Sequence, residues 1–306
     1  MTLPFSDIAP LDKSVPGVQP IEALILPRLP VLYAKRAARL RMLAEHNGAY
    51  LEFLASLVEA QKFWLEQHPI TPEQAMPVTA LMGAGALAPV KPTQQLLATT
   101  PYWHTAFKHF VHTLAPLVSE PVASKLEAAV YDIPEQLAAK VAALFNQDYA
   151  AVDAGVTVLL WAALSVYWAQ AVALVGVQKH TAQAHNEASC PCCGAPPVGG
   201  LVLTGDREGL RYLQCSLCET RWHAVRATCV VCHATQHIDY WTFEKTDAPI
   251  QIETCGDCHS YLKIFRQDRD PQQDALADDL VSQTLDEALE AQGFARAGIN
   301  PFSFPS

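Results

Sequence analysis

The cysteines are the residues in this sequence best suited to chemistry. All nine lie between Cys190 and Cys258, and eight of them form four Cys-x-x-Cys pairs. A Cys-x-x-Cys turn places two thiolates on one side of a metal ion, and a second such turn further along the chain completes a tetrahedral sulfur site. The pattern therefore predicts metal binding. Disulfides, spare thiols and a thioredoxin-like redox motif are the weaker interpretations, because no secretory signal and no βαβ unit are evident.

The four pairs divide into two units. Between Cys193 and Cys215 lie 21 residues, between Cys232 and Cys255 lie 22, and the two units are offset by 39 to 40 residues. This internal duplication predicts two independent metal ions per chain. The first set of ligands would be Cys190, Cys193, Cys215 and Cys218, and the second Cys229, Cys232, Cys255 and Cys258.

The spacing of the cysteines does not identify the metal. Four sulfur ligands suit both zinc, which would be structural, and iron, which could carry an electron. Gly194 directly follows the first pair, as a tight turn whose backbone amides point at sulfur would require. Cys192 is left over and is more simply an unliganded thiol beside the site than an exchangeable ligand. Because small β-ribbons bury little surface, we expect the metal to drive their folding, separately from the rest of the chain.

Composition excludes several classes of protein. The chain has 306 residues, of which 50% are hydrophobic and 17% charged, so about two globular domains are expected. Its formal net charge is −10, and residues 190–306 carry 9 Lys or Arg against 16 Asp or Glu. This balance disfavours nucleic-acid binding, including that of a zinc-ribbon regulator. The sequence contains no phosphate loop, nucleophile elbow or dinucleotide-binding motif, so nothing in it points to these classes of enzyme. The N-terminus lacks the features of a secretory signal, which favours a cytoplasmic location.

The elements that must position the cysteines follow from periodicity and prolines. Six prolines predict an extended lead-in over residues 1–30, and a helical hairpin should follow, broken at Asn47-Gly48. Further helices are predicted over residues 101–118, 121–131 and 134–145. The 25 uncharged residues from Ala154 to Gln178 could cross a bilayer, but a buried central helix fits their alanines and polar residues better. Short β-prone runs begin after residue 185, and an acidic amphipathic helix is expected from Asp270 to Gln292.

Several charged and histidine residues are weaker candidates. The basic residues from Lys35 to Arg41 are interpreted as the solvated face of the first helix. The acidic run from Asp270 to Glu290 is interpreted as a solvated face or, alternatively, as a dock for a basic peptide. The histidines are expected to be surface residues or outer-sphere donors to sulfur, and they are His109, His112, His223, His233 and His259.

Four segments together resemble the FdhE family of formate dehydrogenase accessory proteins: CPCCGAPP, RYLQCSLCETRWHAVRATCVVC, ETCGDCHSYLKIF and GFARAGINPFSFP. The resemblance covers the C-terminal third, and the N-terminal region agrees in length and helical character. It implies a cytoplasmic helper in the biogenesis of respiratory formate dehydrogenases, which are molybdenum or tungsten selenoenzymes exported folded by the twin-arginine route. It also implies rubredoxin-like cysteine turns, bound iron and contact with the catalytic subunit before export. The family's four cysteine pairs fall on the eight paired cysteines given above.

We therefore predict an α+β protein: an all-α N-terminal domain, two tandem rubredoxin-like or zinc-ribbon-like metal-binding subdomains and a C-terminal helix. The expected divisions are a lead-in (1–30), a helical domain (31–185), a first ribbon (186–226), a second ribbon (227–269) and an acidic helix and tail (270–306).

The predicted function is that of a non-catalytic accessory protein that binds the twin-arginine-exported precursor of the formate dehydrogenase catalytic subunit. Two metal ions per chain are expected, with iron favoured and zinc the alternative, and neither nucleic acid nor a membrane span is expected. The paired arginines of the precursor's leader are the hypothetical ligand of the acidic run. A rubredoxin-like electron-transfer protein and a zinc-ribbon binding module are the alternatives.

Overall fold

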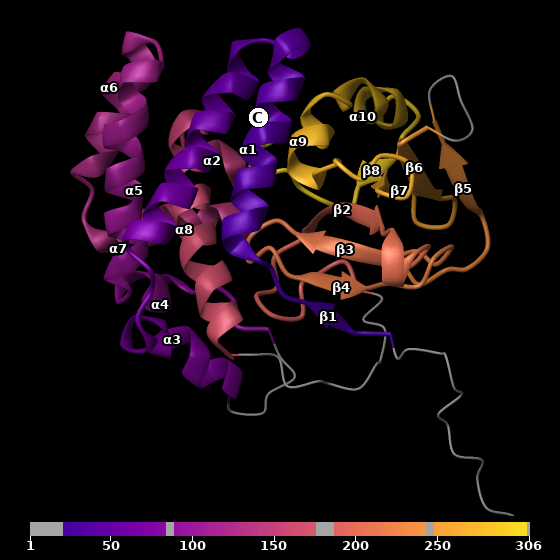
Figure 1. The fold of residues 1–306 in the computed structure, drawn as a ribbon, viewed down its shortest axis with the longest axis horizontal. Coiled ribbons are helices and arrows are strands. Elements are labelled where there is room, and N and C mark those ends of the chain that lie inside the picture. The colour runs from indigo at the N-terminus through magenta and orange to yellow at the C-terminus, as the bar shows by residue number, and fades with distance from the viewer. Residues whose placement is uncertain (1–20, 84–88, 176–186, 243–247, 305–306) are drawn as a thin grey trace, which may run out of the picture.

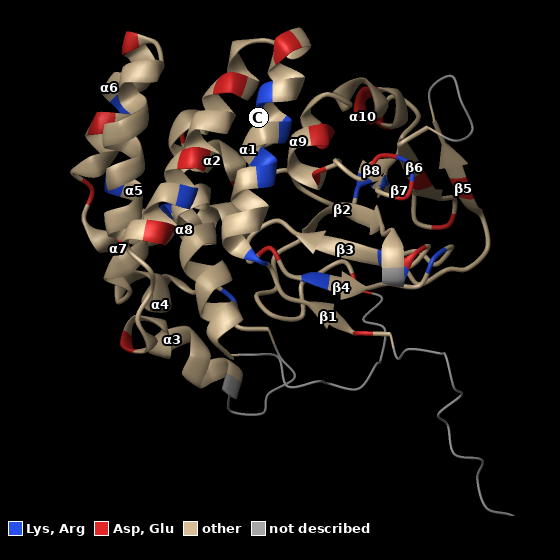
Figure 2. Cartoon of the chain, viewed as in Figure 1, with Lys and Arg blue, Asp and Glu red and all other residues tan. Residues whose placement is uncertain are grey.

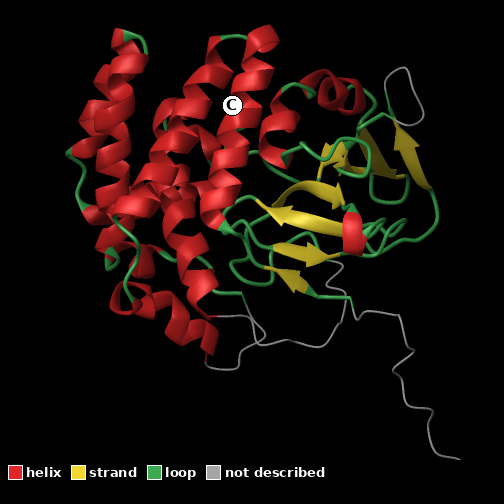
Figure 3. Ribbon diagram, viewed as in Figure 1, coloured by secondary structure: helices red, strands yellow, loops and turns green. Residues whose placement is uncertain are grey.

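The computed structural model describes residues 21–83, 89–175, 187–242 and 248–304. The helices of the N-terminal region gather on one side of the molecule, and the strands lie on the other side together with the two C-terminal helices (Figures 1 and 3). This arrangement confirms the predicted fold class, a helical N-terminal region followed by a sheet that carries two groups of four cysteines.

The helical region opens with the predicted hairpin of α1 (Leu29–Asn47) and α2 (Ala49–Gln67). Gly48 separates the two helices with a φ of 94°, a conformation that glycine adopts without steric cost. Helix α1 begins at Leu29, one residue before the end of the predicted lead-in, because Pro30 suits the first turn of a helix. Before it, the strand β1 (Leu24–Ile25) pairs with a strand of the first ribbon.

Three further helices begin at or next to prolines, as predicted: α5 (Pro101–Leu114), α6 (Glu120–Val130) and α7 (Pro134–Phe145). Two helices were not predicted from the sequence, α3 (Pro72–Gly83) and α4 (Gln94–Ala98). Helix α3 contains an internal proline and α4 has only five residues, so neither presents a long apolar stripe.

Helix α8 (Ala154–Val175) is the predicted central helix. Within the described chain it is the one helix long and apolar enough to cross a membrane, and 83% of its most apolar window is buried inside the protein. It packs against α3 and α5 and is covered on all sides, which explains why it is apolar all round.

The two ribbons form one eight-stranded sheet rather than two separate sheets. The strands of the first ribbon are β2 (Pro197–Val202), β3 (Arg211–Cys215) and β4 (Arg221–His223). Those of the second are β5 (Ile238–Trp241), β6 (Ile250–Cys255) and β7 (Ser260–Arg266). Within each ribbon the strands are antiparallel, whereas β2 and β7 pair in parallel and join the ribbons, with Leu201 opposite Phe265. The order is β1-β4-β3-β2-β7-β6-β5, and β8 (Ala295–Arg296) pairs with β7.

The C-terminal segment differs from the prediction of one acidic helix. It forms two short helices, α9 (Ala275–Leu280) and α10 (Gln283–Glu290), separated near Ser282. Four of its acidic side chains are buried, with exposed fractions of 9% or less, and they are Asp274, Asp278, Asp279 and Asp286. The interpretation of this run as a solvated face or a docking surface is wrong for these four residues.

The buried aspartates pair with cations of the same chain. Arg36 donates to both oxygens of Asp274 at 3.0 and 3.1 Å. Arg39 pairs with Asp278 and, at 2.9 Å, with Asp270. The interpretation of Lys35–Arg41 as a solvated face is therefore wrong for Arg36 and Arg39. Figure 2 shows the basic residues of α1 facing the acidic residues of α9.

The remaining two aspartates pair with residues of the sheet. Lys263 on β7, with no exposed surface, contacts Asp279 at 2.9 Å and Asp286 at 2.5 Å. Arg296 on β8 also contacts Asp279, at 2.7 Å. Ion pairs therefore hold α9 and α10 to the helical region on one side and to the sheet on the other.

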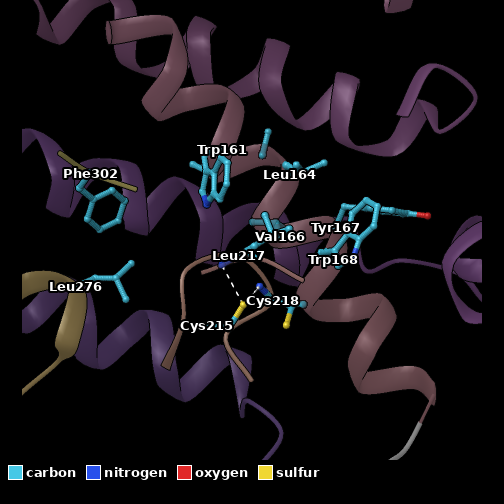
Figure 4. Packing of buried hydrophobic residues seen from close by; sticks show 14 of the residues in the cluster. Trp161, Leu164, Val166, Tyr167, Trp168, Cys215, Leu217, Cys218, Leu276 and Phe302 are labelled. Atoms are coloured by element: carbon cyan, nitrogen blue, oxygen red, sulfur yellow. Dashed lines mark hydrogen bonds between the residues drawn. The ribbon is translucent and has the colours of Figure 1, made fainter. Parts of the chain in front are cut away.

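One continuous core joins the helices, the first ribbon and the C-terminal tail. Trp161 on α8, Leu217 of the first ribbon and Phe302 of the tail belong to the same buried cluster (Figure 4). A smaller cluster beneath α10 contains Ile252, Tyr261, Leu285 and Leu289. The shared core argues against the expectation that the ribbons fold separately from the helical region.

Candidate metal centres

Cluster 1 consists of Cys190, Cys193, Cys215 and Cys218. The first two lie in the turn before β2, and the other two lie where β3 turns into β4. The four Sγ atoms lie within 4.8 Å of one another, with 3.5 Å between Cys190 and Cys218 and 3.4 Å between Cys193 and Cys215. All four residues have an exposed fraction of 0%.

Cluster 2 consists of Cys229, Cys232, Cys255 and Cys258. Its first pair lies in the turn before β5, and its second pair lies where β6 turns into β7. Its Sγ atoms also lie within 4.8 Å of one another, with 3.6 Å from Cys229 to Cys258 and 3.6 Å from Cys232 to Cys255. The structure thus brings together the two sets of four thiols that the spacing proposes.

The sulfur positions fit a tetrahedral metal ion. Metal–sulfur bonds of about 2.3 Å place the sulfurs of a tetrahedral site about 3.8 Å apart, close to the distances in both clusters. A disulfide would require a sulfur–sulfur distance of about 2.05 Å, and none joins any of the nine cysteines. The chain's own residues can therefore supply four sulfur ligands to each of two ions.

The four cysteine turns share one backbone feature. The residue after the second cysteine has a positive φ in each, 72° at Gly194, 61° at Glu219, 63° at His233 and 55° at His259. This left-handed residue turns the chain back, so that the amides of Gly194, His233 and His259 donate to the carbonyl of the first cysteine of their pair at 2.8 to 3.1 Å. The sequence indicated this turn only at Gly194, because the other three positions carry residues that rarely adopt the conformation.

The same turns aim backbone amides at sulfur. At cluster 1, Leu217 and Cys218 donate to the Sγ of Cys215 at 3.3 Å. At cluster 2, Val231 and Cys232 donate to the Sγ of Cys229 at 3.4 and 3.5 Å. Such N–H groups stabilise a thiolate, the form that binds a metal.

In each cluster the surroundings lower the pKa of one thiol and raise the pKa of others. At cluster 1, burial raises the pKa of Cys190, Cys193 and Cys215 well above the usual range, whereas at Cys218 burial is outweighed by hydrogen bonds from the neighbouring cysteines, which lower the pKa. At cluster 2, burial also opposes the ionisation of Cys229, but the backbone amide of Cys232 and the Ser260 hydroxyl outweigh it and lower the pKa of Cys229 to about 7.

Helix α8 covers the turn that carries Cys215 and Cys218. The Trp161 indole donates to the carbonyl of Ser216 at 2.9 Å, and the Ser165 hydroxyl donates to that of Leu217 at 2.7 Å. Leu217 itself has no exposed surface and points toward α8 (Figure 4). These contacts attach cluster 1 to the helical region.

A buried ion pair attaches the same turn to α1. Glu219 directly follows Cys218 and accepts two hydrogen bonds from the Arg36 guanidinium, at 2.7 and 2.9 Å. Burial opposes the charge of Arg36, but Asp274 and Glu219 outweigh it and raise the pKa of Arg36. No local sequence pattern predicts this contact, because 183 residues separate its partners.

The remaining candidates lie outside the two clusters. Cys192 is partly exposed, and its amide donates to the Sγ of Cys190 at 3.4 Å, but its thiol is not one of the four grouped atoms. His109 stacks on Phe63 and lies against Trp64. Across the part of the chain that the structure describes, the residue groups able to hold a metal contain no histidine.

The sequence and the fold are similar to proteins of one family. Three family models match the chain, "FdhE, N-terminal" over residues 21–185, "FdhE, central domain" over 189–226 and "FdhE, C-terminal domain" over 227–303. The "Protein FdhE homolog" of Cronobacter sakazakii is 40% identical over 99% of this chain and 97% of its own length. "Protein FdhE" of Salmonella dublin is 39% identical over 93% and 92%. The crystal structure of the FdhE protein from Pseudomonas aeruginosa superposes with a TM-score of 0.76, at 31% identity, over 93% of this chain and 99% of that one.

Proposed function

Because this chain belongs to the FdhE family, we propose that it is a non-catalytic accessory protein for the biogenesis and maturation of respiratory formate dehydrogenase. The observation that carries the proposal is the pair of assembled four-cysteine clusters in a chain that is similar to FdhE proteins over almost its whole length. In this proposal the protein acts in the cytoplasm on the precursor of the catalytic subunit.

Each cluster holds one metal ion in this proposal, with iron favoured over zinc. The four sulfurs of each cluster have the separation that either metal requires. When bound, the ion supplies positive charge that neutralises part of the four thiolates and cross-links the two turns. Beside cluster 1, Arg36 is already paired with two carboxylates, Glu219 and Asp274, so it adds no net positive charge there.

A binding role is supported by the small size of the hollows near the clusters. The hollow beside Cys229 and Cys255 and the one beneath Arg36 each offer about 10 Å³ of accessible space, about enough for one water molecule. Sites for small-molecule substrates usually measure about 300–1,000 Å³. Neither hollow therefore favours a substrate pocket next to the cysteines.

Electron transfer is the second candidate function, and the exposure of Cys232 at cluster 2 favours it. An iron ion bound there would lie close to the surface, where a redox partner could approach. Reversible reduction of the iron-loaded protein by a defined donor at a physiological rate would support this function over the accessory one.

The proposal is tested in a bacterium that lacks its own FdhE. Expression of this chain should restore formate dehydrogenase activity, and the tagged chain should retain the precursor of the catalytic subunit. Cys215→Ser, which removes a ligand of cluster 1, should abolish both, whereas Cys192→Ser, outside the clusters, should leave both unchanged. If the wild-type chain is folded but neither restores activity nor retains the precursor, the proposed function is wrong.

A further inference from the structure

The two clusters differ sharply in exposure. All four cysteines of cluster 1 have exposed fractions of 0%, whereas Cys232 of cluster 2 is exposed and Cys258 is partly exposed. The other two cysteines of cluster 2, Cys229 and Cys255, are buried at 4% and 2%. The thiols of cluster 2 therefore form a site with a closed side and an open side.

The difference follows from what covers corresponding turns. In the second turn, Leu217 of cluster 1 is fully buried against α8, whereas Asp257, at the same position of cluster 2, is exposed. In the first turn of cluster 2, Val231 is 46% exposed. The first turn of cluster 1 is also covered, since the Val90 amide donates to the Cys192 carbonyl at 2.9 Å and a Cβ on Gly194 would meet the side chain of Lys91.

Exposure controls ligand replacement at a site with four sulfur ligands. In such a step the bond between the metal and one cysteine sulfur breaks, a bond between the metal and an incoming donor forms, and the released thiolate takes a proton from water. No electron is transferred. The incoming donor must reach the cluster, and at a fully buried cluster this requires local unfolding.

We propose that cluster 2 is a ligand-exchange site, at which an external thiolate or chelating group replaces Cys232, and that cluster 1 is a closed structural site. This inference rests on the metal occupancy of the proposed function. In this inference, a partner exchanges a metal ion or a metal ligand at the open side of cluster 2. A soft anionic donor such as a cysteine thiolate can approach the cluster from that side.

Metal release to a chelator tests the inference. The protein is purified without oxygen, its bound metal is counted, and excess EDTA is added while the retained metal is followed by elemental analysis. We expect two equivalents at the start, one of which leaves at least about tenfold faster than the other because its release needs no local unfolding. Cys232→Ser should abolish the fast equivalent and keep the slow one.

A second measurement uses the wild-type protein, so it does not depend on whether the Cys232→Ser variant folds. The metal-loaded protein is treated with iodoacetamide, and the labelled cysteines are mapped by mass spectrometry over time. Among the eight clustered cysteines, Cys232 should be labelled first and Cys258 next, while those of cluster 1 stay protected.

The outcomes separate this inference from the proposed function. A chain that binds no metal would contradict the metal sites of the proposed function. A chain that binds two equivalents but releases both at one rate, or whose cluster 1 cysteines are labelled as early as Cys232, would overturn the exchange site alone.

Discussion

Glu219 shows how one residue connects a metal site to the rest of the fold. Its backbone takes the left-handed conformation that closes the turn after Cys218, and its carboxylate accepts two hydrogen bonds from Arg36. Arg36 in turn binds Asp274 at the start of α9. A buried ion pair of this kind adds little net stability when intact but is costly to break, because one charge then remains buried without a partner.

We predict that Arg36→Met destabilises the protein by about 3–5 kcal/mol, because it leaves Glu219 and Asp274 buried without their cation. The measurement is chemical denaturation followed by circular dichroism. Arg41→Met on the same helix is the matched control. Arg41 is exposed and pairs with Glu52 and Glu59 at the surface, so its loss should cost about 0–1 kcal/mol.

A double variant tests the origin of that cost. Adding Glu219→Gln to Arg36→Met removes one of the two stranded charges and should recover part of the lost stability. Equal destabilisation by Arg36→Met and Arg41→Met would show that the buried pair does not have this role.

His233, unlike Glu219, contributes to its turn through its backbone conformation rather than through its side chain. It closes the first turn of cluster 2 with a φ of 63°, a conformation that costs about 1–2 kcal/mol for a residue with a Cβ. Glycine avoids that cost but loses about 0.5–1 kcal/mol to its greater freedom in the unfolded chain. His233→Gly should therefore be more stable than His233→Ala by about 0.5–1 kcal/mol in denaturation of the metal-loaded protein. If the alanine variant is the more stable of the two, the turn does not carry the strain inferred here.

At the scale of elements, a cysteine turn is buried or exposed according to whether a helix packs over it. Leu217 in the second turn of cluster 1 is packed beneath α8 (Figure 4), whereas Val231 in the first turn of cluster 2 is 46% exposed. The sequence presents both as apolar residues within a Cys-x-x-Cys pair, so it could not predict which turn is covered.

We predict that Leu217→Ala costs about 2–5 kcal/mol, because it leaves a cavity in a fully buried site. Val231→Ala should change the free energy of unfolding by no more than about 0.5 kcal/mol. Thermal and chemical denaturation of the two metal-loaded variants provide the comparison. Similar losses in both would contradict the difference in cover between the two turns.

Helices α9 and α10 show a limit of sequence patterns. The amphipathic character predicted for residues 270–292 is confirmed on the apolar side, where Leu276, Leu285 and Leu289 are buried. Periodicity could not show that the acidic positions face cations from α1, β7 and β8 rather than water, because those partners are remote in sequence. The basic run of α1 and the acidic run of α9 were each interpreted as solvated, although Arg39 and Asp278 bind each other.

At the scale of the whole molecule, the cysteine spacing and the helical periodicity predicted the main elements but not how the ribbons join. They predicted the helical hairpin, the central helix α8 and the two groups of four thiols. The parallel pairing of β2 with β7, which merges the ribbons into one sheet, had no local signal, because the pattern of each strand is independent of its partner. The packing of Phe302 in the C-terminal tail against the helical core also had no local sequence signal.

The continuous core predicts how the protein responds to metal removal. Cluster 1 lies between α8 and the sheet, so loss of its metal should loosen the packing of Trp161 and destabilise the helices as well as the ribbons. In reduced, metal-free protein, the far-ultraviolet circular dichroism of the helices and the tryptophan fluorescence should melt together, at a lower temperature than in the metal-loaded protein. Helices that melt at an unchanged temperature after metal removal would indicate an independent helical domain.

The central claim is that each four-cysteine cluster holds its own metal ion. Elemental analysis of protein purified without oxygen tests it most directly, for the wild type and for the single variants Cys190→Ala and Cys229→Ala. The account predicts two metal ions per chain in the wild type and one in each variant, since each cluster draws its ligands from its own ribbon. Loss of both ions from either single variant, or a wild-type chain without bound metal, would contradict it.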